Sequence, residues 1–161
     1  MVIILTGVSG AGKSTVGSQL AMALGWQFID ADDIHPAANK EKMQRGTPLT
    51  DTDRWPWLDS IRSVIQNFAA RRQDAVVACS ALKAAYREKL EIDPATVKFV
   101  YLKGDQALIA QRLEKRRDHF MNRSLLRSQF ETLEEPVGAI IVDIRQTPGE
   151  IAAAVRTALQ I

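Results

Sequence analysis

A phosphate-binding motif lies at the beginning of the chain. An apolar run, residues 2–6, leads directly into Gly-Val-Ser-Gly-Ala-Gly-Lys-Ser and then into a helical pattern. In such a G-x-x-x-x-G-K-S loop, backbone N–H groups point at phosphate oxygens, and the following helix adds the positive end of its dipole. The lysine reaches the β- and γ-phosphates, and the serine hydroxyl is a ligand for Mg²⁺. We therefore predict that a nucleoside triphosphate with Mg²⁺ binds at Gly7, Ser9, Gly10, Ala11, Gly12, Lys13, Ser14 and Thr15.

Three carboxylates follow the second strand-like run, residues 27–30. Asp30, Asp32 and Asp33 are followed at once by His35 and a proline. Phosphoryl transfer to an alcohol needs a carboxylate that orients or deprotonates the attacking hydroxyl, and often another that holds Mg²⁺ through water. We expect Asp32 to be this base and Asp30 to act on Mg²⁺, on one side of the chain if strand geometry continues. Alternatively, the acids only cap and solvate a turn, and His35 is a contact at the start of a helix rather than a substrate ligand.

Cationic and aromatic side chains predict an anionic acceptor. Arg54 offers a planar fork for an anion, and Trp57 offers a flat apolar wall, although Trp57 is equally suited to the core. Lys83 and Arg87 are spaced i, i+4 and suit an anionic substrate such as a carboxylate, or form a solvated surface pair. The third strand-like run ends in Cys79 rather than in the aspartate that often binds Mg²⁺ in P-loop enzymes. This argues against GTPases and motor ATPases.

The elements that must position these residues alternate between short apolar runs and helical patterns. The runs are β-branched and almost continuously apolar, as strands covered on both faces are. They comprise residues 2–6, 27–30, 75–79, 97–102 and 139–143. Alternation of this kind predicts an α/β fold in which helices flank a parallel sheet and ligands bind at the carboxyl ends of the strands.

Helix ends are also visible in the sequence. A glycine stop at Gly25 predicts the end of the first helix, and a second helix is expected over residues 53–72. Asp105 is a capping residue for a helix that reaches Arg116 or Arg117. The sequence Thr-Pro-Gly-Glu at 147–150 combines a capping box with proline at the first helical position. The last helix is therefore expected to begin there.

Composition limits the class of protein. The 161 residues fit one domain, and a net charge of +2 is too small to imply nucleic-acid or membrane binding. Cys79 is the single cysteine, which excludes an internal disulfide and suits a reducing compartment. No stretch approaches the roughly 20 apolar residues that span a bilayer. We expect a cytoplasmic enzyme with a small-molecule substrate, and no nucleic-acid or membrane partner.

Taken together, these segments resemble the P-loop type of bacterial gluconokinase (gluconate kinase). The resemblance covers essentially the whole chain, and its Asp–His-Pro and Arg-x-Pro-Trp-Leu blocks are more specific than the phosphate loop. It rests on residues 7–14, 30–36 with Asn39, 42–43 with Gly46, 48–49, Asp51, 53–54, 56–58, 79–83, 86–87, 119–121, 125–126 and 128–130.

The resemblance implies a nucleoside-monophosphate-kinase-like fold with a five-stranded parallel sheet and a small lid at about residues 116–136. It also implies ATP-dependent phosphorylation of D-gluconate to 6-phospho-D-gluconate, Mg²⁺ as the metal, and a homodimer. By analogy, Arg116 lies in the lid near ATP and acts in catalysis, and Arg145 and Pro148 flank the adenine. Two alternatives remain: a P-loop kinase of another small acceptor (shikimate-like or a nucleoside monophosphate), and a non-catalytic nucleotide switch.

Overall fold

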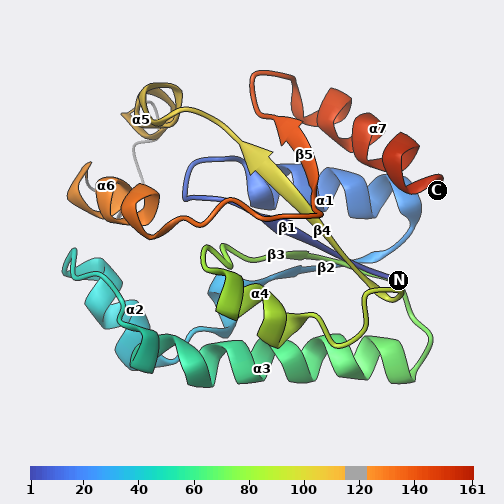
Figure 1. The fold of residues 1–161 in the computed structure, drawn as a ribbon, viewed down its shortest axis with the longest axis horizontal. Coiled ribbons are helices and arrows are strands. Elements are labelled where there is room, and N and C mark those ends of the chain that lie inside the picture. Colours follow the sequence, from blue (N-terminus) through green and yellow to red (C-terminus); the bar gives the residue numbers. More distant parts are fainter. Residues whose placement is uncertain (115–122) are drawn as a thin grey trace.

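The computed structural model describes residues 1–114 and 123–161 (Figure 1). Five parallel strands form one sheet in the order β2-β3-β1-β4-β5. The strands are β1 (Val2–Thr6), β2 (Gln27–Asp30), β3 (Ala75–Ala78), β4 (Val97–Lys103) and β5 (Ile140–Asp143). The predicted α/β fold with a five-stranded parallel sheet is confirmed, and the strand ends lie within one residue of the expected ones.

Helices connect the strands and cover both faces of the sheet. They are α1 (Lys13–Leu24), α2 (Ala37–Gln44), α3 (Asp51–Ala70), α4 (Ala84–Leu90), α5 (Gln106–Glu114), α6 (Arg123–Thr132) and α7 (Pro148–Leu159), with a short 3₁₀ helix, η1 (Ala31–Ile34). Figure 1 shows α1 and α7 on one face and α3 and α4 on the other. In the part of the chain that the structure describes, no helix is both long and apolar enough to cross a bilayer.

The sequence of the central strand β1 is apolar from Val2 to Leu5 because both faces of the strand are covered. Ile3 and Leu5 pack into the core beneath α1 and α7, whereas Val2 and Ile4 pack into the core beneath α3. All four side chains are fully buried. Because successive side chains of a strand point to opposite faces, a strand with helices on both sides needs apolar residues throughout. This strand is therefore a rigid support for the loop that follows it.

The predicted ends at Gly25, Asp105 and Thr147 are observed, whereas α3 begins and ends two residues before the expected residues 53 and 72. Gly25 caps α1 in the left-handed conformation with a φ of 68°. Thr147 and Glu150 form a reciprocal capping box, and Pro148 opens α7. The carboxylate of Asp105 accepts the N–H of Leu108 at 2.8 Å, as expected of a cap. The expected end of this helix at Arg116 or Arg117 lies outside the described residues.

The chain does not continue as a strand after Asp30. Its carboxylate accepts the backbone N–H of Asp32 at 3.0 Å and caps η1, so the backbone turns at once. The condition under which strand alternation would place Asp30 and Asp32 on one side, continued extended geometry, is therefore not met. A side chain that bonds to the backbone two residues later favours a turn over continued extension.

Candidate active site

The phosphate loop connects β1 to α1. Gly7 and Gly12 have positive φ angles of 142° and 97°, which glycine adopts without steric cost. A Cβ atom on Gly7 would also lie 2.9 Å from the carbonyl oxygen of Leu102. These glycines let the chain curl around the amino end of α1, where free N–H groups and the helix dipole attract phosphate. The loop therefore has the backbone geometry of an anion site.

Lys13 closes this loop from within. Its Nζ donates to the carbonyl oxygen of Val8 at 3.1 Å, and the side chain also lines the cavity beside the loop. Burial lowers the pKa of the Lys13 ammonium, while the carboxylates of Asp32 and Asp30 raise it. A phosphate oxygen placed beside Nζ would supply the negative charge and the strong acceptor that this partly desolvated cation lacks.

Ser14 and Asp30 form a small set of oxygen ligands at the mouth of the loop. The Ser14 hydroxyl donates to Oδ2 of Asp30 at 2.5 Å. Over residues 1–114 and 123–161, no group of three or more His, Cys, Asp or Glu side chains could hold a metal ion. Mg²⁺ keeps several waters and binds through one or two protein oxygens together with substrate phosphates. The hydroxyl and the carboxylate therefore fit Mg²⁺ better than a metal that needs a complete protein cage.

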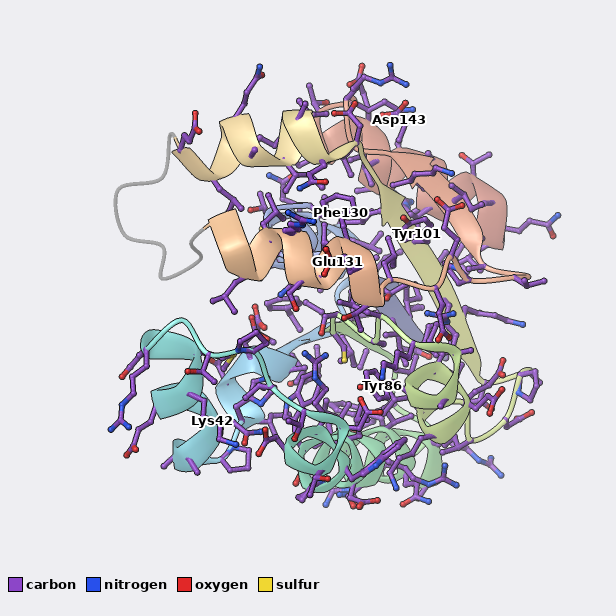
Figure 2. All side chains as sticks on the ribbon, turned by 60° about the vertical axis from the view of Figure 1, so that its left-hand side comes forward. Lys42, Tyr86, Tyr101, Phe130, Glu131 and Asp143 are labelled. Atoms are coloured by element: carbon purple, nitrogen blue, oxygen red, sulfur yellow. The ribbon has the colours of Figure 1, made fainter. Side chains whose placement is uncertain are left out.

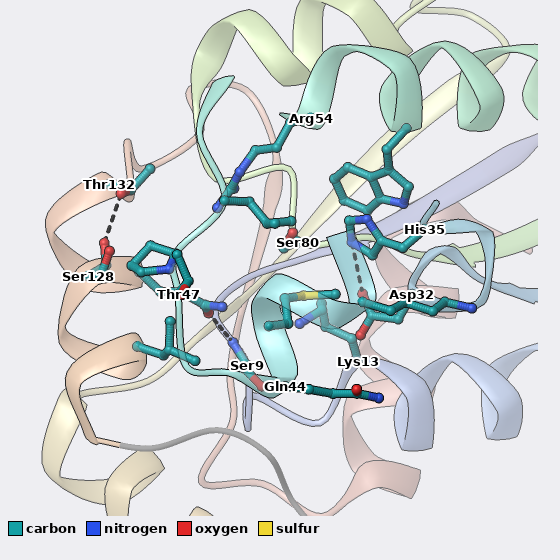
Figure 3. A pocket seen from close by; sticks show the side chains of 17 residues that line it. Ser9, Lys13, Asp32, His35, Gln44, Thr47, Arg54, Ser80, Ser128 and Thr132 are labelled. Carbon is teal, nitrogen blue, oxygen red and sulfur yellow. Dashed lines mark hydrogen bonds and ion pairs between the residues drawn. The ribbon is translucent and has the colours of Figure 1, made fainter. Parts of the chain in front are cut away.

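A cavity of about 360 Å³ adjoins the loop (Figure 3). Figure 2 shows α6, which carries Phe130 and Glu131, across from α2, which carries Lys42; side chains from both helices line the cavity. The lining residues are Ser9, Lys13, Asp32, His35, Lys40, Met43, Gln44, Thr47, Pro48, Leu49, Arg54, Trp57, Ser80, Leu125, Ser128, Gln129 and Thr132. Its size and mixed lining suit a small polar molecule held beside the phosphate loop.

His35 and Trp57 form one wall of this cavity. Their rings stack with centroids 4.1 Å apart and planes inclined by 11°, and the Trp57 indole N–H donates to the carbonyl oxygen of Ala31 at 2.7 Å. Burial, together with the positive charges of Arg54 and Lys40, lowers the pKa of His35 to about 4. His35 is therefore neutral at pH 7. Trp57, which is 1% exposed, belongs both to the core and to the cavity wall.

Asp32 is the one carboxylate among the cavity-lining residues in the described part of the chain. Its Oδ1 lies 4.0 Å from Nε2 of His35, and its charge acts on the Lys13 ammonium. Asp30, by contrast, faces Ser14 and the loop mouth. The structure thus separates the two acids: one lies in the cavity and the other lies beside the candidate metal ligands.

Arg54 brings a positive charge to the same cavity. It lies in the first turns of α3, and its Cζ is 5.6 Å from the centroid of the Tyr86 ring. Its Nε is buried and has no hydrogen-bond partner in the structure as described. A buried guanidinium N–H without a hydrogen-bond acceptor is costly. An anion bound in the cavity would supply that acceptor.

Lys83 and Arg87 do not reach the cavity. Lys83 pairs with Asp51 at 2.8 Å, and the Tyr86 hydroxyl donates to the same carboxylate. Arg87 donates to the carbonyl oxygens of Ala81 and Leu82 at 3.0 and 2.9 Å. The two cations therefore stabilise the segment after β3, and the geometry gives them no contact with a molecule bound beside Asp32.

Three further residues expected to bind the nucleotide, Thr15, Arg145 and Pro148, do not line the cavity. Thr15 is exposed on the first turn of α1. Arg145 is exposed and pairs with Asp143 at 2.5 Å, and Pro148 opens α7 directly after this segment. The expected position of Arg145 and Pro148 beside adenine remains a prediction. Arg116 lies outside the described residues.

Several polar lining residues were not assigned from the sequence. Ser128, Gln129 and Thr132 all reach the cavity from α6. Thr132 lies four positions after Ser128 and three after Gln129, the spacings that bring side chains together on a helix surface. That spacing is a usable signal. The opposite wall, however, comes from α2 and the segment after it, so only the folded chain shows that this face lines a site.

A central strand, a glycine-rich phosphate loop and an adjoining cavity with one carboxylate define a P-loop phosphotransferase. Residues 2–136 match the family model described as AAA domain. A probable gluconokinase from Xenopus tropicalis is 47% identical over 152 residues, which cover 84% of this chain and 80% of that relative. The chain belongs to the gluconokinase family of P-loop kinases.

Two solved structures have the same architecture. A gluconokinase from Sinorhizobium meliloti 1021 is 44% identical and superimposes with a TM-score of 0.88, covering 99% of this chain and 91% of that one. A sugar kinase from Janibacter sp. HTCC2649 is 40% identical with a TM-score of 0.93, covering 99% and 94%. These likenesses include every element that lines the cavity.

Proposed function

We propose that the chain transfers the γ-phosphoryl group of ATP to the 6-hydroxyl of D-gluconate, giving 6-phospho-D-gluconate and ADP. The observation that carries this proposal is that Lys13, Asp32 and Arg54 line one cavity. These residues supply a phosphate ligand, a base and a carboxylate ligand, which are the three groups that phosphorylation of a sugar acid requires. The gluconokinases to which the chain is similar support the choice of acceptor.

The phosphate loop places ATP so that its γ-phosphate faces the cavity. Ser9 and Lys13 belong to both the loop and the cavity lining, so the γ-phosphate and the acceptor would meet beside these two residues. Ser14 and, through water, Asp30 would hold Mg²⁺, which neutralises charge on the phosphate oxygens when it is bound. Lys13 adds a fixed cation that stabilises the charge of the transferring group.

The acceptor binds with its carboxylate on Arg54 and its chain along the His35–Trp57 wall. The oxygen of the 6-hydroxyl bonds to the γ-phosphorus while Asp32 accepts the hydroxyl proton. The bond from that phosphorus to the β–γ bridging oxygen breaks. ADP leaves with the electron pair of that bond. Because the guanidinium presents a planar pair of donors, Arg54 also orients the acceptor.

The lid and the assembly state are further parts of the proposal. We place the lid at about residues 116–136, with Arg116 closing on the phosphates and Arg145 and Pro148 beside the adenine. We further propose a cytoplasmic homodimer with no nucleic-acid or membrane partner. Light scattering during size-exclusion chromatography measures the subunit number directly.

A coupled assay for ADP release tests the reaction. The purified protein is mixed with ATP and Mg²⁺, and ADP formation is compared between D-gluconate, a blank without acceptor, shikimate, AMP and related sugar acids. We expect D-gluconate to give the largest rate above the blank, and ³¹P NMR to show a phosphate monoester on its 6-position.

Lys13→Ala provides the control that the activity belongs to this site. The substitution removes the loop cation without removing a core contact, so the protein should fold while turnover falls on the order of 100-fold or more. Near-normal turnover of folded Lys13→Ala would contradict the site. A larger rate with another acceptor than with D-gluconate would contradict the proposed substrate but would still support kinase activity.

A further inference from the structure

The orientation of the Asn39 side-chain amide follows from its partners. Asn39 lies on α2 and is 4% exposed. One end of its amide lies 2.8 Å from the carbonyl oxygen of Asp53. A backbone carbonyl only accepts hydrogen bonds, so the end that faces Asp53 must be the NH₂ group. That carbonyl belongs to the first turn of α3, where Asp53 and Thr50 form a reciprocal capping box.

The same NH₂ group faces the ring of His35. Nδ2 of Asn39 lies 3.3 Å from Nδ1 of His35, and His35 is 7% exposed. Because Nδ2 carries hydrogens and no free lone pair, Nδ1 must be the acceptor in this contact. A neutral imidazole that accepts at one nitrogen carries its proton on the other. The proton of His35 is therefore on Nε2.

The Nε2–H group points toward the reacting end of the cavity. Nε2 lies 4.0 Å from Oδ1 of Asp32, and Figure 3 shows the two side chains facing each other. The hydroxyl oxygen of a substrate, placed about 2.8 Å from each of these atoms, would form hydrogen bonds to both. Lys40 and Arg54 are the cations that act on the imidazole from α2 and α3, and both disfavour a second proton on it.

We infer that Asn39 is a positioning residue that holds His35 as the neutral Nε2–H tautomer, so that His35 donates a hydrogen bond to the acceptor hydroxyl and Asp32 alone takes the proton. The inference rests on the proposed reaction for the identity of the hydroxyl. The tautomer itself rests on the Asp53–Asn39–His35 contacts and does not depend on the substrate.

Nitrogen NMR of the wild-type protein measures the tautomer directly. The chain has two histidines, so comparison of ¹⁵N-histidine-labelled wild type with His35→Gln identifies the His35 signals. Between pH 6 and 8 we expect Nδ1 without a proton and Nε2 with one. A proton on Nδ1 in the wild type would overturn the inference, and no variant of Asn39 is needed for this result.

Reversing the polarity of residue 39 tests the control that Asn39 exerts. Asn39→Asp replaces the NH₂ donor by a carboxylate, so the proton of His35 should shift to Nδ1 or the ring should become charged. We expect kcat with D-gluconate to fall at least about tenfold, since an incorrectly placed imidazole proton is costly in catalysis, while KM for ATP stays within about twofold. Asn67→Asp is the matched control, because Asn67 is exposed on α3.

The outcomes separate this inference from the proposed function. An unchanged ring signal in folded Asn39→Asp, or an equal loss of kcat in Asn67→Asp, would contradict the role of Asn39. If Asn39→Asp does not fold, Asn39→Ala removes the donor and should give a mixture of the two tautomers. If NMR shows the expected tautomer but D-gluconate causes no ADP release, the role of Asn39 toward His35 is supported and the proposed substrate is contradicted.

Discussion

The backbone N–H of Ser9 donates to Oε1 of Gln129 at 2.6 Å. This bond joins the phosphate loop to α6, and both residues line the cavity. The Ser9 N–H therefore faces the position that the proposed function gives to the γ-phosphate. The amide oxygen of Gln129 thus accepts from an N–H group that, in the proposed function, a phosphate oxygen would also use.

Gln129→Ala should therefore change the preference between ATP and ADP. Without the competing amide oxygen, binding of a non-hydrolysable ATP analogue should tighten relative to ADP by up to about fivefold, the worth of a hydrogen bond of about 1 kcal/mol. Calorimetric titration with both nucleotides measures the ratio. Glu131→Gln, on an exposed part of the same helix, should leave it unchanged; an unaltered ratio in Gln129→Ala would show that the bond does not compete with nucleotide.

Replacing Asp32 or Asp30 by asparagine should affect different steps of the reaction. Asp32→Asn keeps the shape of the side chain but cannot accept the proton, so kcat should fall on the order of 100-fold with similar affinity for an ATP analogue. Asp30→Asn weakens the oxygen pair with Ser14 and should raise the Mg²⁺ concentration needed for half-maximal rate. Steady-state kinetics over a Mg²⁺ series separates these effects. Loss of all turnover in Asp30→Asn with near-normal Asp32→Asn would exchange the two roles.

Arg54→Lys tests the site of the acceptor carboxylate. Lysine keeps the charge but loses the planar pair of donors, so KM for D-gluconate should rise about tenfold while KM for ATP changes little. Arg45→Lys is a suitable control, because Arg45 is exposed and pairs with Glu41 at 3.9 Å. Equal KM values for D-gluconate in wild type and Arg54→Lys would place the carboxylate elsewhere.

His35 should make the folded state sensitive to mild acid. Its pKa is lowered from 6.5 to about 4 by burial, so between these values the unfolded chain binds a proton that the folded chain does not. Stability therefore falls as the pH drops from about 6.5 to about 4, by at most about 3 kcal/mol. Urea unfolding of wild type and His35→Gln at several pH values measures this contribution as the part of the pH dependence that His35→Gln lacks.

A second group titrates outside that window. Hydrogen bonds from Lys42 and Thr50 lower the pKa of Asp53 from 3.8 to about 2. Its contribution is present above about 3.8 and is lost as the pH falls toward 2. A loss of stability that begins only below pH 4 would therefore contradict the assignment to His35.

Local sequence determined what could be predicted. The phosphate loop and the strand bounds were recognisable because their signals lie within short stretches. The positions of Lys83 and Arg87 depend on partners that spacing along α4 does not reveal: Asp51, 32 residues away, and the carbonyl groups of the preceding turn. The bond between Ser9 and Gln129 spans 120 positions, so no local pattern could predict it.

The place of β1 in the sheet has a consequence for synthesis on the ribosome. Of the five strands, β1 is the earliest in the sequence, yet it lies at the centre of the sheet and pairs with β3 and β4. Until residues 75–78 and 97–101 have emerged, the nascent chain carries an apolar strand with two unsatisfied edges. Such edges promote association between unfinished chains. The position that makes β1 a rigid support in the enzyme therefore leaves residues 2–6 dependent on protection until residues 97–101 have been made.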